Sequence, residues 1–194
     1  MPDLTLVVVA ATDADLAKFQ SAETDGIDLR LMVNHYGESL AGIANRELDA
    51  SRRAVFGLCH ADTVFLAGSL AAFTDAAMAG AVCGLVGATL DGSYHCCYAA
   101  GVDGPGPVST LDAMGVFFRR DLGLRFDAET FDGFHCHVED LCLQAAAVGI
   151  PITVPAADAH HRNHNHARAE WQAQYQVYRQ RLLAKWEGTE FRTT

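Results

Sequence analysis

The sequence has little positive charge and no cysteine pair of the kind that binds zinc. It carries 14 Lys and Arg residues against 24 Asp and Glu residues, a formal net charge of -10. That balance argues against a nucleic-acid partner, because proteins that bind phosphate backbones usually present a basic surface. The six cysteines include no CxxC pair. They therefore indicate neither a zinc knuckle nor a disulfide framework, and buried reduced thiols are expected instead.

Long hydrophobic runs, a basic leader and internal repeats are also lacking. No apolar run is as long as a membrane span, and residues 1–11 pass into a strand-like segment without a basic start. We therefore expect no signal peptide and a cytoplasmic protein. Half of the 194 residues are hydrophobic, which is ordinary for a soluble protein, and the length suits a single domain over residues 1–194.

What the sequence does have is a regular alternation of short apolar runs with amphipathic stretches. Strands are expected at 4–10, 29–33, 55–62, 82–87, 111–118 and 152–154. Helices are expected at 39–51, from 69 to 80, from about 139 to 149 and over about 167–187, with a short one after Thr12. This order predicts an α/β fold: a Rossmann-like, mixed and mainly parallel sheet with helices on both faces.

The strand at 55–62 ends in two side chains that can bind a metal ion. His60 and Asp62 are two residues apart, so at a strand end they point the same way. Ligands of open α/β sheets bind at the carboxyl ends of the strands, which suits a divalent cation or a charged ligand here. The alternative is a capped strand end with two solvated polar groups.

Two further polar groups follow other predicted elements at the same end of the sheet. Glu139 and Asp140 stand at a helix start, where they could equally be acids stabilised by the helix dipole. His160 and His161 follow the strand at 152–154, and either could be a ligand. His135 and His137 are expected beside an acceptor site or simply exposed, and His164 and His166 in a loop. Together the groups fit a metal-dependent site.

With these residues in order, the chain resembles the family-two glycosyltransferases of the GT-A fold over nearly its whole length. The specific part is FDAETFDGFHCHVEDLCLQAAAVGIPITVPAADAHH at 126–161, which is similar to the family's acidic-pair helix and terminal metal histidine. The HxD of His60 and Asp62 stands where the family has DxD. Because the first aspartate is replaced, the identity of the metal is left open.

The resemblance implies a chemistry for each of these residues. Asp62 and His160 would hold Mn²⁺ or Mg²⁺ against the diphosphate of a nucleotide-sugar donor. Asp140 would be the base that deprotonates a carbohydrate or other hydroxyl acceptor, with inversion at the sugar. The nucleotide pocket would be lined by Thr12, Asn34, Asn45 and His60. The acceptor or transferred sugar would be contacted by Asp112, Glu139 and His135.

The sequence leaves other functions and partners open besides the hexosyltransferase activity that the resemblance implies. A non-catalytic nucleotide-sugar or carbohydrate-binding protein of the same fold is the main alternative, motivated by His60 and by the small size of the chain. A nucleotidyltransferase is disfavoured because residues 10–15 are neither glycine-rich nor basic. The aromatic face of the tail helix is expected to pack against the core or to form a homodimer, rather than to contact a membrane.

Overall fold

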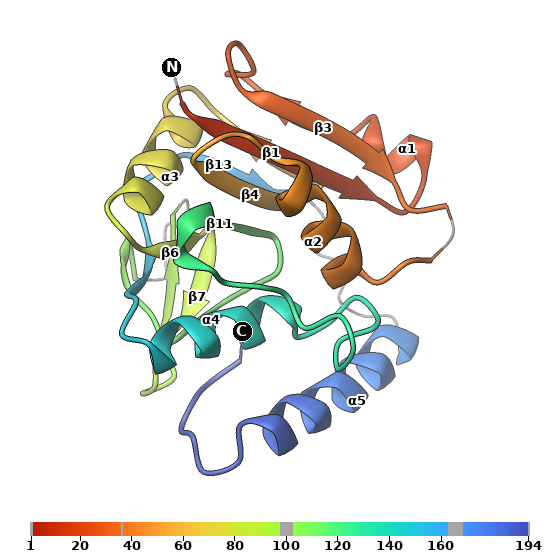
Figure 1. Ribbon diagram of the computed structural model, residues 1–194, viewed down its shortest axis with the longest axis vertical. Helices are drawn as coiled ribbons and strands as arrows, with labels where there is room; N and C mark the ends of the chain where they lie inside the picture. Colours follow the sequence, from red (N-terminus) through yellow and green to blue (C-terminus); the bar gives the residue numbers. More distant parts are fainter. Residues whose placement is uncertain (1, 36, 98–102, 163–168, 194) are drawn as a thin grey trace.

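The computed structural model describes residues 2–35, 37–97, 103–162 and 169–193, and a seven-stranded sheet lies at its centre (Figure 1). The strand order is β3-β1-β4-β11-β6-β12-β9. The strands are β1 (Leu4–Ala10), β3 (Asp28–Val33), β4 (Val55–His60), β6 (Val82–Gly84), β9 (Gly106–Pro107), β11 (Gly115–Arg119) and β12 (Ile152–Val154). All but β9 and β11 run in one direction. The predicted mixed, mainly parallel sheet is confirmed.

Helices cover both faces of this sheet, as the sequence predicts. On one face α2 (Leu40–Ala50) and α4 (His137–Ala147) pack against strand residues such as Val7 and Phe56. On the other face α3 (Ser69–Met78) packs against Leu6 and Phe117, and Leu16 of α1 (Asp13–Leu16) packs against the same core cluster. Alternate residues of each strand enter opposite cores. The six cysteines are free thiols, five of them buried.

Two small three-stranded sheets flank the central one and were not predicted. One joins β10 (Thr110–Leu111), β7 (Val86–Ala88) and β8 (Tyr94–Cys96), and the other joins β13 (Ala159–His161), β5 (Thr63–Phe65) and β2 (Gln20–Ser21). The run expected as one strand at 82–87 is therefore two strands, and β13 follows the strand expected to be last. Strands of two or three residues are too short to show a hydrophobic period.

The helix α5 (Ala169–Lys185) lies against the start of α4 and the loop before it (Figure 1). Its Leu182 is buried with Phe131 and Leu143, while Tyr175 and Tyr178 pack at the edge of this cluster. The aromatic face thus packs against the core, one of the two roles expected for it. Residues 167 and 168 of the predicted helix lie outside the described residues. No helix in the described ranges is both long and apolar enough to cross a membrane.

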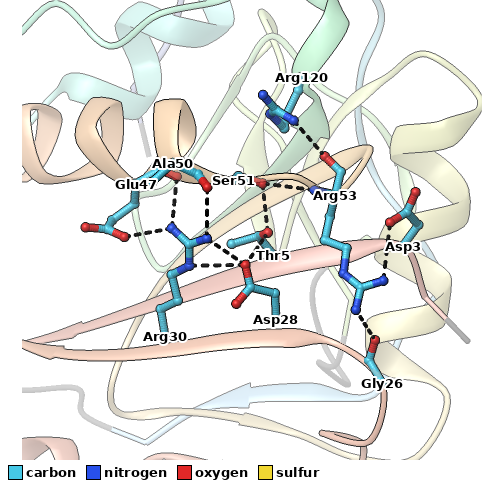
Figure 2. A network of polar contacts seen from close by, with 10 residues as sticks. All are labelled: Asp3, Thr5, Gly26, Asp28, Arg30, Glu47, Ala50, Ser51, Arg53 and Arg120. Atoms are coloured by element: carbon cyan, nitrogen blue, oxygen red, sulfur yellow. Dashed lines mark hydrogen bonds and ion pairs between the residues drawn. The ribbon is translucent and has the colours of Figure 1, made fainter.

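A polar network fixes α2 to the end of the sheet where β1 and β3 begin. Figure 2 shows Arg30 donating to Asp28 (2.7 Å), to the Glu47 carboxylate (2.9 Å) and to the Ala50 carbonyl (3.3 Å). Thr5 donates to the same Asp28 at 3.0 Å. Arg30 thereby donates to a carbonyl group in the last turn of α2, which has no partner within the helix. The network is structural, and it lies at the end of the sheet opposite the carboxyl end of β4.

Candidate functional site

His60, Asp62 and His161 converge at the carboxyl end of β4. His60 is the last residue of that strand, Asp62 lies in the turn to β5, and His161 ends β13. One possible ligand atom from each of the three lies within 4.8 Å of the others, and His161 Nε2 is 3.0 Å from Asp62 Oδ1. Two imidazoles and a carboxylate at this spacing form a candidate metal centre, which we call the metal triad.

Strand pairing explains why the triad contains His161 and not the predicted ligand His160. β13 runs antiparallel to β5 with His161 opposite Thr63, and Arg162 N donates to the Asp62 carbonyl at 3.0 Å. Because side chains alternate along a strand, His160 points away from the triad. Its side chain is 44% exposed, with Nε2 2.8 Å from Asp158 Oδ1. Of the two histidines left open by the sequence, the geometry favours His161.

The charges of the triad suit a cation. Burial lowers the pKa of His60 despite the opposing effect of Asp112 and Asp62, and its Nε2 has no hydrogen-bond partner in the described part of the chain. Burial alone would raise the pKa of Asp62, but His161 and His60 outweigh it and hold the pKa below its ordinary value. A neutral imidazole whose Nε2 lacks a partner therefore lies beside an ionised carboxylate, and metal ligands require these protonation states.

Glu139 is a buried acid in the first turn of α4. Burial, and next the charge of Asp112, raises its pKa to about 8. Its Oε2 is buried without a hydrogen-bond partner among the described residues. Asp112 also acts electrostatically on His60, so one carboxylate influences both Glu139 and the triad. A carboxylate of this kind is suited to accept a proton near neutral pH.

The histidines on either side of Cys136 are more buried than expected. His137 is fully buried as the first residue of α4, 5.9 Å from the Phe126 ring, and burial lowers its pKa to about 3. The expectation of an exposed His137 on a loop is wrong, because α4 begins two residues before Glu139. Burial also lowers the pKa of His135, whose ring lies 5.6 Å from that of Phe134.

Asp140, the predicted catalytic base, anchors α5 instead of facing the triad. Its fully buried carboxylate accepts hydrogen bonds from Trp186 Nε1 (2.8 Å) and Gln144 Nε2 (2.8 Å) and pairs with Lys185 Nζ (2.8 Å). Successive residues of an α-helix project about 100° apart, so Glu139 and Asp140 face different surroundings. With its oxygens committed to three side chains, Asp140 is poorly placed to receive a proton from an acceptor.

Two of the predicted nucleotide-binding residues lie at the same end of the sheet as the triad. Thr12 follows β1 and caps α1, and Asn34 follows β3, where its backbone N donates to the Ala10 carbonyl at 2.8 Å. The Asn45 amide donates to the Phe126 carbonyl (2.7 Å) and accepts from the Phe126 N (3.1 Å), so Asn45 holds a loop to α2. The Asn34 amide is paired in the same way, donating to the Glu38 carbonyl (2.7 Å) and accepting from Glu38 N (2.9 Å), and the Thr12 hydroxyl is bonded to Asp15.

Sequence reasoning missed the roles of Lys185 and Trp186, which no local pattern signals. The choice of His161 could have been made from the alternation of residues 159–161, had β13 been recognised as a strand. His164 and His166 lie outside the described residues. Among known proteins, no family model matches the chain and no curated protein is a significant match.

Proposed function

We propose that this chain is a metal-dependent glycosyltransferase of the GT-A type, which moves a sugar from a nucleotide-diphosphate donor to an acceptor hydroxyl. The observation that carries the proposal is the metal triad at the carboxyl end of β4, and the buried acid Glu139, whose pKa Asp112 also raises, adds to it. Phosphoryl groups bind at that end of open α/β sheets. The mixed sheet, with its helices on both faces, supports the same reading.

The ligand set favours Mn²⁺ over Mg²⁺ among the two cations expected from the sequence. Mg²⁺ prefers carboxylate and water oxygens, whereas imidazole nitrogen suits transition metals. His60 and His161 supply two imidazoles and Asp62 one carboxylate. A cation held there would offset the negative charge that develops on the departing nucleoside diphosphate.

The protein groups around the triad supply the remaining steps. Glu139, when ionised, takes the proton of the acceptor hydroxyl while the oxygen of that hydroxyl bonds to the anomeric carbon of the donor sugar. The bond to the diphosphate breaks on the opposite side, so the configuration inverts. Asp140 fixes the first turn of α4 to α5 and is a positioning residue for Glu139. Thr12 and Asn34 stand at the end of the sheet where the nucleoside would bind, with their side chains paired to Asp15 and Glu38.

Calorimetry with UDP and GDP, with and without Mn²⁺, tests the proposal. Binding should require Mn²⁺ and should be lost in Asp62→Ala, because the triad loses its only carboxylate. Asp75→Ala is the matched control, since it removes the same charge from an exposed position on α3. Failure of both nucleotides to bind in the presence of Mn²⁺ would contradict the proposal.

The occupied carboxylate of Asp140 favours a second candidate, a binding protein of this fold without transfer activity. The residue that the resemblance assigns as base is bonded to Lys185 and Trp186 and cannot serve in that position. Under this alternative, nucleotide sugars bind with Mn²⁺ but are neither transferred nor hydrolysed, and Glu139→Gln changes nothing. Incubation with nucleotide sugars and detection of free nucleoside diphosphate separates the two.

A further inference from the structure

A chain of aromatic rings leads from the metal triad to the surface and ends at Trp171 on α5. The Phe134 ring lies 4.9 Å from the His60 ring, and the Trp171 ring lies 4.8 Å from Phe134 and 5.1 Å from His135. Trp171 is 40% exposed, although a tryptophan gains much from burial. A partly exposed indole thus lies one ring away from a ligand of the proposed cation.

The surroundings hold this indole in place before any ligand arrives. Phe134 and His135 meet it at 66° and 85°, so both contacts are edge-to-face. Farther along α5, Leu182 is buried in the core and Lys185 pairs with Asp140, which fixes the helix. A ring that is already ordered costs a ligand little conformational entropy.

The chemistry of the region selects the kind of ligand. A pyranose ring has an apolar C–H face that can cover an indole, and hydroxyl groups at its rim that remain free for polar contacts. A single platform of this size suits one sugar ring better than the length of an acyl chain.

We propose that Trp171 is the stacking platform for a sugar ring of the acceptor, and hence that the acceptor is a glycan. The inference rests on the proposed transferase function, because it assigns the second substrate of that site. Phe134 and His135 act as positioning residues that hold the indole beside the triad.

The full-length protein can be tested with methyl glycosides of glucose, galactose, mannose and N-acetylglucosamine, and with the matching disaccharides. Binding measured by calorimetry should weaken about tenfold in Trp171→Ala, a typical loss for a stacked ring. Binding of a glycoside should also change the fluorescence of Trp171. Trp171→Phe should retain binding but lose this fluorescence change, since the other tryptophan, Trp186, is held by its hydrogen bond to Asp140. Val177→Ala, at an exposed position on the same helix, is the matched control.

The outcomes separate this inference from the proposed function. If no glycoside binds, or if Trp171→Ala binds and transfers as Val177→Ala does, the platform is overturned. If glycosides bind through Trp171 while UDP and GDP do not bind with Mn²⁺, the platform stands and the transferase proposal fails. Glycerol, which has hydroxyl groups but no ring, should not compete with the glycosides, and competition by glycerol would also count against stacking.

Discussion

Glu139 and Asp140 are neighbours whose surroundings give them different tasks, and this difference is testable by pH. If Glu139 is the base, kcat/KM should rise with pH as its carboxyl group ionises, with a midpoint at or below about 8 because a bound cation favours the ionised form. Glu139→Gln should lower kcat by about 10²- to 10⁴-fold and leave Mn²⁺-dependent nucleotide binding intact. A pH-rate profile unchanged by Glu139→Gln would contradict this assignment.

His160 and His161 provide a matched pair of substitutions for the metal triad. His161→Ala removes an imidazole 3.0 Å from Asp62 and should weaken Mn²⁺ binding by about a hundredfold or more. His160→Ala removes an exposed imidazole that pairs with Asp158 and should leave the affinity unchanged. Titration with Mn²⁺, followed by calorimetry or paramagnetic resonance, compares them. A larger loss in His160→Ala would restore the ligand first expected from the sequence.

At the scale of the elements, the docking of α5 depends on one buried group, the carboxylate of Asp140. Asp140→Ala would leave Lys185 and Trp186 without the carboxylate they share, and should cost about 3 kcal/mol of unfolding free energy. Thermal unfolding measures the cost, and hydrogen exchange should show lost protection in α5 while β1 and β4 stay protected. Asp75→Ala, at an exposed position on α3, is the control. Equal melting temperatures for Asp140→Ala and the unaltered protein would remove the anchoring role.

The longer elements could be predicted because their residues repeat with a recognisable period. The helix expected at 39–51 is observed as Leu40–Ala50, and the strand at 4–10 as Leu4–Ala10. The strands β5 and β13 have three residues each and gain their pairing from one another, so nothing local marks them. The same limit applies to the start of α4, where Cys136 has a positive φ of 63° and no side chain caps the helix.

At the scale of the whole molecule, Glu139 and His137 make stability depend on pH in opposite senses. The pKa of Glu139 rises from 4.5 to about 8, so the folded state holds an extra proton between these values and loses stability as pH rises. The pKa of His137 falls from 6.5 to about 3, so the unfolded state holds the extra proton there and stability falls with falling pH. The two effects offset each other between pH 4.5 and 6.5.

Stability should therefore be highest near pH 4.5 to 6.5 and decline on both sides. From pH 6.5 to 8 the decline due to Glu139 should reach about 2 kcal/mol, at about 1.4 kcal/mol per pH unit. Glu139→Gln should remove most of that alkaline decline, and His137→Phe should reduce the acid one. Urea unfolding at a series of pH values, with a chelator present, gives the profile. An alkaline decline as steep in Glu139→Gln as in the unaltered protein would contradict the prediction.

For the candidate site, the sequence predicts which segments of the chain come together but not which side chains face one another. Position along the chain places His60, Asp62 and Glu139 at one end of the sheet, because they follow or precede elements of a parallel fold. It cannot decide which of two adjacent residues turns inward. That choice depends on the register of β13 with β5 for His161, and on the docking of α5 for Asp140.

The pairing of β13 with β5 brings Asp62 and His161 together from distant parts of the chain. An ion bound by both would cross-link two segments that lie far apart along the backbone. Occupancy of the triad should therefore raise the melting temperature and slow digestion by proteases. Screening of cations and nucleotides could then proceed by heat resistance alone, before any acceptor is known.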